Sequence, residues 1–400
     1  MSYIYTRKLK VDIIFLFALF LLFFSFFTNL CVVTGDSIER NYWPTTDWQT
    51  ATYEEVNMNG SRIDVMFDYI DYHSYDIESL LIVKDGYLVT EEYFQGYTAD
   101  TRHVLWSVTK SWMSTLIGIA IEEGYIDSVD QKILDFLYNA SIPNIDLKEN
   151  ITISHLLTMT SGMSWNEVDV SYADPSNNET QMVASDNWVE YVLSSKMDYK
   201  PGTTYYYNTG GSHLLSAIIE KATGYSSLEY ATTHIFNPLG ITNISWEQDP
   251  QGIYFGGAGL ELLPRDMAKF GFLFLNNGTW DGTQIVSQEW VQAATNSTID
   301  IMSEFSYGYQ WWSKPSKNYY FASGLYLQLI IVIPEYDLVV TITADDHTNN
   351  IYTYTELIDS FIVAAAKQGY NPSTTETTFI FLLPLSSLLI IVNIIIKRSR

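Results

Sequence analysis

Cysteine and basic residues are both scarce in this sequence. The only cysteine among the 400 residues, Cys31, lies inside an apolar segment near the start of the chain. The rest of the chain can therefore form neither an internal disulfide nor a thiolate metal site. There are 21 Lys and Arg residues against 46 Asp and Glu residues, and the formal net charge is −25. A surface with this charge repels phosphates, so nucleic acid is not expected as a partner.

Histidine is scarce as well. The six histidines are scattered, and their positions show no spacing typical of metal ligands. No metal site is therefore predicted. Two of them, His155 and His213, fall within predicted helices and are interpreted as packing or capping residues.

Apolar and aromatic side chains are abundant. Hydrophobic residues make up 47% of the chain and aromatic residues 15%, including 30 Tyr and 11 Trp. This composition excludes intrinsic disorder and supplies a core large enough for one large domain or two fused lobes. The aromatic content is typical of an enzyme with a pocket, and it would suit a sugar-binding module as well.

The chain begins with a short basic stretch followed by a long apolar run. Arg7, Lys8 and Lys10 precede residues 11–33, which are almost entirely apolar. This is the pattern of a secretory signal peptide. The run is long for a signal peptide, and no clear cleavage site follows it. Residues 1–35 are therefore predicted to be either a signal peptide or an uncleaved signal-anchor.

A second apolar run lies near the end of the chain. Residues 379–396 are predicted to form a transmembrane helix, preceded by a tether at 370–378 and followed by a basic cytoplasmic tail at 397–400. A buried core helix is the alternative, which the three closing cations disfavour. Both ends place positive charge inside, so the region between them is predicted to lie outside the cell membrane. Seven glycosylation sequons give this weak support: Asn59, Asn139, Asn150, Asn178, Asn243, Asn277 and Asn296.

The middle of the chain is predicted to contain a linker at residues 36–60 and one folded domain at residues 61–369. Strand hairpins are expected near both ends of this domain, and helices are expected mostly between them. The hairpins are residues 80–84 with 87–93 and residues 329–333 with 338–343, and the helices cover residues 104–123, 154–160, 212–223, 263–275 and 354–367.

The order of these elements predicts the fold class. Strands at both ends of the domain with helices between them favour one antiparallel sheet assembled from the N- and C-terminal parts, with helices flanking it. The helices between the hairpins would then form an inserted, mostly helical lobe. The expected class is α/β in the sense of an α+β sandwich.

The motif that most directly indicates chemistry is Ser107-Val-Thr-Lys110. In a helix, positions three apart share a face, so the lysine can reach the serine hydroxyl. If the lysine is desolvated, its pKa falls and it can act as a base toward the serine. A chain of this size is expected to contain roughly one such motif by chance. The motif gains weight because it lies where a helix is predicted to begin.

A second candidate element is Tyr206-Tyr207-Asn208, just before the predicted helix at residue 212. A phenol beside a cationic lysine could take part in moving the serine proton. The asparagine amide could bridge the lysine and a substrate carbonyl. Considered alone, the segment is better explained as an aromatic turn.

Longer stretches of sequence carry a family resemblance. The chain resembles the β-lactamase-related serine hydrolases, a group that includes class C β-lactamases, D-Ala-D-Ala peptidases and family VIII esterases. Within this group it is most similar to the branch of 6-aminohexanoate-oligomer (nylon-oligomer) hydrolases. The resemblance implies a β-lactamase/transpeptidase-like fold. The matching stretches occur in family order at residues 106–111, 153–165, 206–208, 237–240, 257–260, 264–271 and 307–312.

The resemblance also implies a third motif, on a strand beside the serine. In much of the family this motif begins with Lys or His, but the matching residues here are Ala322, Ser323 and Gly324. The nylon-oligomer branch looks similar at this point. The cation that would bind a substrate carboxylate is therefore absent, which disfavours penicillin hydrolysis and peptidoglycan trimming. An ester or amide substrate that needs no carboxylate at this position is favoured.

By the same resemblance, Ser107 would attack a substrate carbonyl while Lys110 and Tyr206 relay its proton. The backbone N–H groups of Ser107 and Leu325 would form the oxyanion hole. Asn208 would hold Lys110 and the substrate. Water would then release the acyl-enzyme, and no metal or organic cofactor would be needed.

The function expected from the sequence is that of a membrane-anchored, extracytoplasmic serine hydrolase acting on small ester, amide or peptide substrates. The membrane contact would be the C-terminal helix, with or without the N-terminal one. Two alternatives stay open: a penicillin-binding-type surface protein that acylates but turns over poorly, and a non-catalytic surface module on the same fold. The intact Ser107, Lys110, Tyr206 and Asn208 argue against the non-catalytic module.

Overall fold

A strand hairpin near the start of the folded region forms one part of the main sheet. In the computed structural model, β1 (Ile77–Lys84) and β2 (Tyr87–Tyr93) are antiparallel and are joined by Asp85 and Gly86. These two residues have φ angles of 54° and 87°. Both angles are left-handed, as a two-residue hairpin turn requires. The predicted hairpin is confirmed.

The second predicted hairpin is also confirmed. It joins β12 (Gln328–Ile333) to β13 (Leu338–Ala344) through a short turn at Pro334–Tyr336. Strand β13 pairs antiparallel with β1, so hairpins more than 200 residues apart in sequence become neighbours in one sheet.

The structure describes residues 40–297, 299–301 and 304–369. The chain divides into two units, Met1–Asn41 and Tyr42–Arg400, and all the helices and strands named here belong to the second. The predicted segments at 1–35, 370–378, 379–396 and 397–400 lie outside the described residues. Within the described ranges, no helix combines the length and the apolar character needed to cross a membrane.

In the described part of the chain, the main sheet has eight antiparallel strands in the order β2-β1-β13-β12-β11-β10-β9-β8. The first two strands come from the start of the folded region and the other six from its end, as predicted. The strands not yet described are β8 (Ile299–Asp300), β9 (Ser306–Tyr307), β10 (Trp312–Lys314) and β11 (Tyr319–Gly324).

Helices cover both faces of this sheet, so alternate residues of a strand enter two different cores. In β1, Leu80 and Ile82 pack into one core, whereas Leu81 and Val83 pack into the other. This double burial explains why β1 reads as a continuous apolar run rather than as an alternating one.

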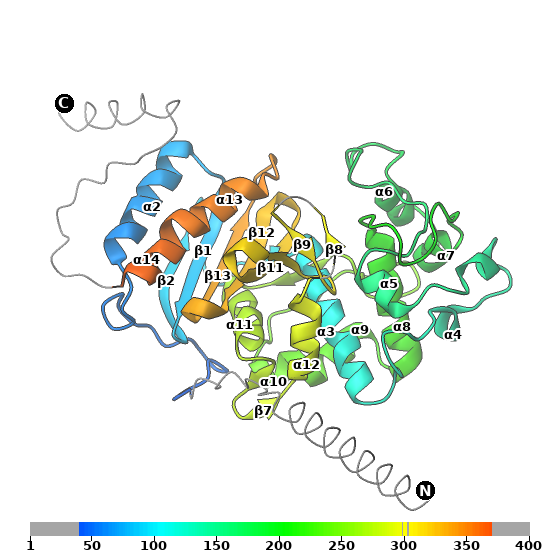
Figure 1. The fold of residues 1–400 in the computed structure, drawn as a ribbon, viewed down its shortest axis with the longest axis horizontal. Helices are drawn as coiled ribbons and strands as arrows, with labels where there is room; N and C mark the ends of the chain where they lie inside the picture. Colours follow the sequence, from blue (N-terminus) through cyan, green and yellow to red (C-terminus); the bar gives the residue numbers. More distant parts are fainter. Residues whose placement is uncertain (1–39, 298, 302–303, 370–400) are drawn as a thin grey trace, which may run out of the picture. The chain divides into compact units, whose positions relative to one another are not determined.

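One face is covered by the first and last helices of the folded region. These helices lie side by side over β1, β2 and β13 (Figure 1). They are α2 (Gly60–His73) and a continuous C-terminal helical stretch made of α13 (Ile351–Leu357), a π-helical turn (Ile358–Val363) and α14 (Ala364–Gln368). The predicted helix at 354–367 is therefore confirmed, although it begins three residues earlier.

The other face is covered by α11 (Pro264–Leu275), which lies against β12 and β13. Gly271 allows this close approach, because a Cβ at that position would lie 2.6 Å from Val339 Cγ1. Helix α3 (Thr109–Glu122) packs against α11 in turn, and the rings of Trp112 and Phe270 stack with their centroids 3.8 Å apart.

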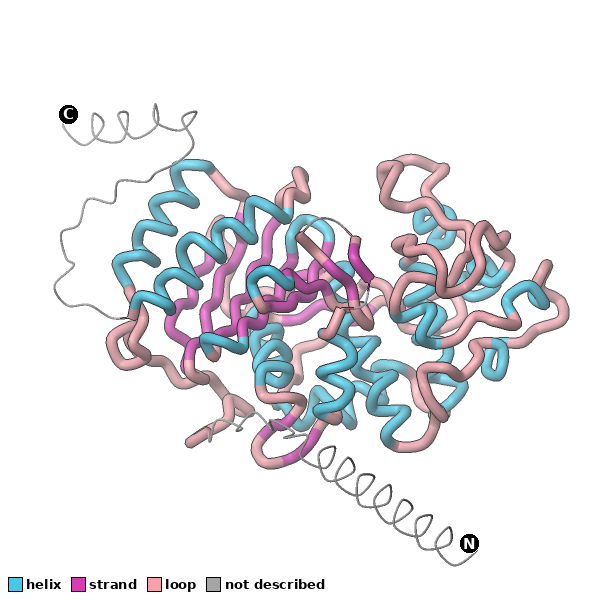
Figure 2. The backbone as a smooth tube through the Cα atoms, in the orientation of Figure 1, coloured by secondary structure: helices cyan, strands magenta, loops and turns pink. Residues whose placement is uncertain are grey.

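The chain between β2 and β8 forms the mostly helical insert that the sequence predicts, with long loops between its helices (Figure 2). Besides α3 and α11, its helices are α4 (Leu134–Leu137), α5 (Ile153–Leu157), α6 (Asn178–Val183), α7 (Trp188–Leu193), α8 (Thr209–Thr223), α9 (Ser227–Ala231), α10 (Asn237–Leu239) and α12 (Gln288–Thr295). Its short strands are β3 (His103–Val104), β4 (Ser245–Trp246), β5 (Leu260–Leu262), β6 (Thr279–Trp280) and β7 (Thr283–Gln284). The expected fold class is confirmed.

The predicted start of the first helix after the N-terminal hairpin is corrected. The helix expected from residue 104 begins only at Thr109, because Val104 belongs to β3 and pairs with β5. The next residue, Leu105, donates its N–H to Leu260 O at 2.8 Å. A backbone that is already bonded to another strand cannot take part in helical hydrogen bonds at the same residues.

The predicted linker also differs from the structure. Residues from Tyr42 onward belong to the folded unit, and Trp48, Val56 and Met58 are buried in it. Burial of three apolar side chains favours a packed segment over a free one. The folded unit therefore begins at Tyr42 rather than at residue 61.

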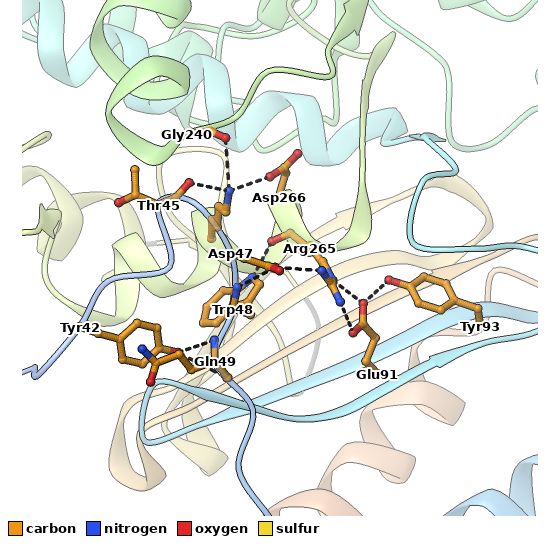
Figure 3. A network of polar contacts seen from close by, with 11 residues as sticks. Tyr42, Thr45, Asp47, Trp48, Gln49, Glu91, Tyr93, Gly240, Arg265 and Asp266 are labelled. Atoms are coloured by element: carbon orange, nitrogen blue, oxygen red, sulfur yellow. Dashed lines mark hydrogen bonds and ion pairs between the residues drawn. The ribbon is translucent and has the colours of Figure 1, made fainter.

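A network of polar contacts holds this N-terminal segment in place (Figure 3). The Arg265 guanidinium, in the first turn of α11, binds the two carboxylate oxygens of Glu91 at 2.6 and 2.7 Å and Asp47 Oδ1 at 2.8 Å. Tyr93 donates a further hydrogen bond to Glu91 at 2.6 Å. Burial opposes the ionisation of Glu91, but the hydrogen bonds from Arg265 and Tyr93 outweigh it and lower the pKa of this carboxyl. Arg265 thus joins α11, β2 and the N-terminal segment.

A second cation of α11 adds to the network. Lys269 Nζ lies 3.2 Å from Asp266 Oδ1 and 3.4 Å from the carbonyl oxygens of Thr45 and Gly240. The side chains of Lys269 and Asp266 are both buried. Their charges therefore act in a medium that screens them little.

Replacing Arg265 by alanine should lower the free energy of unfolding by about 1–3 kcal/mol, because it leaves the Glu91 carboxylate without its cation and beside Asp47. Urea denaturation at neutral pH measures the change. The lowered pKa of Glu91 stabilises the fold above the unfolded pKa of about 4.3, and this contribution disappears as pH falls through the folded value. The difference between wild type and variant should therefore shrink in acid.

Lys317→Ala is the control for the loss of one basic side chain. Its side chain is 51% exposed and lies 3.9 Å from Asp359, so its removal should change the free energy by less than about 0.5 kcal/mol. Equal losses of unfolding free energy in the two variants would contradict a stabilising role for the contacts of Arg265 with Glu91 and Asp47.

Candidate active site

The serine and the lysine of the Ser-X-X-Lys motif lie side by side where α3 begins. Ser107 lies in a 3₁₀ turn, Trp106–Val108, that leads directly into the helix. Lys110 is the second residue of α3, and its Nζ lies 2.8 Å from Ser107 Oγ. Trp106, immediately before the serine, has a φ angle of 47°, which is uncommon for a large side chain. Backbone strain of this kind is concentrated at functional sites.

The Lys110 amine is enclosed by the protein, and its side chain is 1% exposed. Its Nζ also donates to Gly257 O at 2.8 Å and lies 4.9 Å from the centroid of the Tyr207 ring. Burial lowers the pKa of Lys110 to about 8, although the carboxyl groups of Glu167 and Glu179 favour the protonated form of the amine. A large fraction of the amine is therefore neutral at mildly alkaline pH, and a neutral amine can accept the proton of the adjacent hydroxyl.

The three tyrosines before α8 alternate in direction. Tyr205 lies against Tyr307, with ring centroids 5.6 Å apart, and Tyr207 lies next to Lys110 and makes a polar contact with Ser107. Tyr206 instead donates its hydroxyl to Asp169 Oδ2 at 2.6 Å. Successive side chains of an extended segment point to opposite sides, so residues 205 and 207 share one side and residue 206 does not.

This alternation corrects the predicted contact. The tyrosine beside Ser107 and Lys110 is Tyr207, not Tyr206. Burial raises the pKa of Tyr207 far above its usual range, so its phenol keeps its proton at neutral pH. The hydrogen bond to Asp169 raises the pKa of Tyr206 to about 12, and that phenol is protonated as well.

Asn208 is held as the N-cap of α8, where its Oδ1 accepts the Gly211 N–H at 2.8 Å. The predicted contact with Lys110 is not seen: in the described part of the chain, the hydrogen-bond acceptors of Lys110 Nζ are Ser107 and Gly257. The Asn208 side chain is buried, and its Nδ2 has no hydrogen-bond partner among the described residues. A buried amide of this kind is expected to meet a polar partner, such as a bound molecule.

Strand β11 brings the predicted third motif to the serine. Ala322, Ser323 and Gly324 are its last three residues and pair with β12. A Cβ on Gly324 would lie 2.3 Å from Leu105 O and 3.2 Å from Ser107 N. Only glycine allows the strand to approach the Ser107 backbone this closely.

Leu325 follows Gly324 in the turn between β11 and β12. The next two residues, Tyr326 and Leu327, have left-handed φ angles of 58° and 68°, so the turn is sharply bent. Gly324 lies against the backbone nitrogen of Ser107, and Leu325 is the next residue after Gly324. The oxyanion hole formed by the N–H groups of Ser107 and Leu325 stays a prediction.

Comparison with known proteins identifies the family. Residues 78–354 match the family described as Beta-lactamase. The chain belongs to the Beta-lactamase family. The identification made from the sequence is therefore confirmed.

The curated relatives are consistent with the branch that the sequence indicates. A 6-aminohexanoate-dimer hydrolase from Paenarthrobacter ureafaciens is 25% identical over 259 residues, which cover 59% of this chain and 64% of that protein. A lovastatin esterase from Penicillium rubens is 32% identical over 100 residues, which cover 23% of each chain. The matches thus span less than two thirds of these relatives' length.

Solved structures agree on the fold. A putative 6-aminohexanoate-dimer hydrolase from Bacillus anthracis superposes with a TM-score of 0.66 at 22% identity, covering 83% of this chain and 88% of that one. An octameric penicillin-binding protein homologue from Pyrococcus abyssi superposes with a TM-score of 0.59 at 24% identity, covering 76% and 77%.

Three residues that the sequence analysis did not single out are connected, directly or through one another, to the Beta-lactamase-family lysine. They are Gly257, which accepts from Lys110, and Glu167 and Thr209, which bond to each other. Gly257 lies in a stretch that matched the family, but its carbonyl contact carries no sequence signal. Glu167 is a single carboxylate in an irregular segment, and no spacing rule links it to a lysine 57 positions earlier.

The interpretation of the histidines is confirmed. His155 forms a capping box with Thr152 at the start of α5, and His213 is buried with its Nε2 3.1 Å from Asp249 Oδ2.

Three tryptophans of the stretches that match the family differ in burial. Trp165 and Trp311 are buried core residues, whereas Trp312 is half-buried and stacks on Tyr207 with centroids 6.4 Å apart.

Proposed function

We propose that this protein is a serine hydrolase that cleaves small esters or amides through an acyl-enzyme on Ser107. The observation that carries the proposal is the 2.8 Å contact between Ser107 Oγ and the buried Lys110 amine. A buried amine with a pKa of about 8 is a base near physiological pH, and it already touches the hydroxyl that must lose a proton.

The first half of the reaction forms the acyl-enzyme. Ser107 Oγ attacks the substrate carbonyl carbon, and its proton passes to Lys110, with the Tyr207 phenol in position to relay it. The negative charge that develops on the carbonyl oxygen is stabilised by the N–H groups of Ser107 and Leu325. Collapse of this intermediate breaks the ester or amide bond, and the leaving alcohol or amine takes up the proton.

The second half releases the product. A water molecule gives a proton to the same relay and adds to the acyl carbon, which regenerates an oxyanion in the same place. Collapse then returns the proton to Ser107 Oγ and frees a carboxylic acid. The unpaired Nδ2 of Asn208 can donate a hydrogen bond to the substrate in both halves.

The third motif narrows the substrate class. Ala322, Ser323 and Gly324 contribute no cation to the strand beside Ser107, so a substrate carboxylate would find no charged partner on it. The relatives named as a 6-aminohexanoate-dimer hydrolase and a lovastatin esterase support amide and ester substrates. The missing cation on this strand also disfavours a penicillin-binding role.

We propose further that the chain is anchored in the cell membrane by residues 379–396, with or without residues 1–35, and that the hydrolase unit lies outside. The support is the sequence pattern alone: two apolar runs, each flanked by cations on the side that would face the cytoplasm.

Ser107→Ala should lower hydrolysis of a p-nitrophenyl ester by more than about 10³-fold, because it removes the nucleophile while leaving the fold intact. The assay uses purified protein and records p-nitrophenolate release. Labelling by a fluorophosphonate should be lost in parallel. Ser111→Ala is the matched control, because it removes the hydroxyl of a nearby serine in α3 that donates to Gln310 O instead. Turnover that survives in Ser107→Ala would overturn the proposal.

The wild-type protein should not form a stable adduct with labelled penicillin. Rapid ester turnover without such an adduct supports a hydrolase. A long-lived penicillin adduct with little ester turnover would support the receptor alternative instead.

Tyr207→Phe should lower the ester hydrolysis rate by about 10²-fold or more, since general acid–base groups contribute about 10²–10⁴-fold. Tyr206→Phe should change it by less than about threefold, because that hydroxyl bonds to Asp169 and not to Ser107. Each substitution removes one oxygen from neighbouring tyrosines, so each serves as the control for the other. The reverse ranking would restore the assignment made from sequence.

The full-length protein should stay with the membrane fraction after an alkaline carbonate wash. A protein reduced to residues 42–369 should appear in the supernatant, since it lacks both apolar runs. Release of the full-length protein by carbonate would contradict the anchoring, and it would leave the hydrolase proposal untouched.

A further inference from the structure

Glu167 is a fully buried carboxyl group in the helical insert, and it influences Lys110 electrostatically. One carboxylate oxygen accepts hydrogen bonds from Trp165 Nε1 and from Thr209 N, the latter at 2.8 Å. The other accepts from Thr209 Oγ1 at 2.6 Å and from Tyr172 OH at 3.3 Å. All four donors are neutral, so they satisfy the oxygens without cancelling the charge.

Thr209 connects this carboxylate to the lysine. It is the first residue of α8, and it donates both its N–H and its hydroxyl to Glu167. Its other side packs on Gly257, where a Cβ would lie 2.4 Å from Thr209 Cγ2 and 2.9 Å from Thr209 O. Gly257 O in turn accepts the hydrogen bond from Lys110 Nζ at 2.8 Å. A chain of direct contacts therefore runs from the carboxylate to the amine.

Charge links the same two groups. Burial is the largest influence on Lys110 and lowers its pKa to about 8, and the charge of Glu167 is the largest influence that opposes burial. Glu179, in the first turn of α6, acts in the same direction. Burial, with the charges of Glu167 and Glu247, raises the pKa of Glu179 itself to about 8. Glu179 is therefore mostly neutral at pH 7, which leaves Glu167 as the carboxyl group with the largest influence against the burial of the amine.

We propose that Glu167 is a positioning residue of this site: its buried carboxylate holds the first turn of α8 against Gly257, and its charge sets how strongly Lys110 binds a proton. The inference rests on the proposed function of Ser107 and Lys110. Glu167 acts through the lysine and does not itself take part in bond making.

The chemical consequence follows from the proton transfer. When Ser107 Oγ bonds to the substrate carbonyl, its proton moves to the Lys110 amine and leaves a buried ammonium group. A buried ammonium without a counter-charge is costly, so an amine surrounded only by neutral groups would be a poor acceptor. The charge of Glu167 offsets part of this cost. The remaining neighbours of Lys110 are neutral at pH 7. They are the Ser107 hydroxyl, the Tyr207 phenol and the Gly257 carbonyl.

The pH dependence of ester hydrolysis tests this role. The reaction needs the neutral amine, so the rate should rise with pH through the pKa of Lys110, near 8 in the wild type. Loss of the Glu167 charge favours the neutral amine. Glu167→Gln should therefore move the rising part of the pH–rate profile, its acid limb, to lower pH by about one unit. The plateau rate should fall by about tenfold, because a weaker base accepts the proton less readily.

Two control variants separate charge from structure. Glu167→Asp keeps the charge and should keep the limb within about 0.3 pH unit of the wild type. Asp359→Asn removes a partly buried carboxylate on the far side of the sheet, where it pairs with Lys314 at 2.9 Å, and should move neither limb nor plateau. A lower plateau with an unmoved limb in Glu167→Gln would mean that Glu167 only supports the fold, and it would overturn the proposed control of Lys110.

A second measurement does not depend on activity. Lys110→Met, Glu167→Gln and the double variant are compared by thermal unfolding at pH 7, where the amine is mostly protonated. Each single change leaves one buried charge without its counter-charge, so the double variant should lose less stability than the sum of the two single losses. If Glu167→Gln alone does not fold, recovery of folding in the double variant supports the proposal. Additive losses, or no recovery, contradict it even if Ser107 proves to be the nucleophile.

Discussion

The candidate active site is built around a lysine amine that is buried against a serine hydroxyl. Lys110 is almost completely enclosed, and its Nζ lies 2.8 Å from Ser107 Oγ. A lysine side chain is stable in such a place only if its donors are satisfied and its charge is either opposed or given up. Here the serine and the Gly257 carbonyl accept its hydrogen bonds, and burial makes proton loss easy. The groups around the amine therefore define both the fold of the site and its chemistry.

These groups come from distant parts of the chain, and the architecture brings them together. Backbone hydrogen bonds between β3 and β5 hold the residues that precede Ser107. The close approach of Gly324 sets the end of β11 beside the serine amide. Helix α8 begins with the capped turn that carries Asn208 and Thr209. Helix α11 fills the space between the sheet and α3, and its Arg265 ties the N-terminal segment to β2, so the site is supported by rigid elements on several sides.

The distribution of charge around Ser107 bears on the kind of substrate that the site can take. The third-motif strand has no cation, which leaves Lys110 as the positive group in direct contact with Ser107 among the described residues. The buried carboxyl group of Glu167, in the helical insert, opposes the effect of burial on the Lys110 amine. A site with this distribution has little to attract a carboxylate and much to keep a lysine near its point of ionisation. This agrees with a hydrolase of neutral ester or amide bonds better than with a receptor for anionic peptides.

Local spacing in the chain was enough to predict the contact of Ser107 with Lys110, one helical turn apart, and the two hairpins, which are marked by turn residues such as Asp85-Gly86. The sequence by itself also determined the family, because many short stretches matched in order. Tertiary structure alone decided which of three consecutive tyrosines faces the serine, since an extended run of identical residues has no internal mark of register. It likewise decided that Asn208 caps α8, that the folded unit begins at Tyr42, and that Glu167 influences Lys110 electrostatically. Contacts of this kind join residues far apart in the chain, and only long-range packing fixes them.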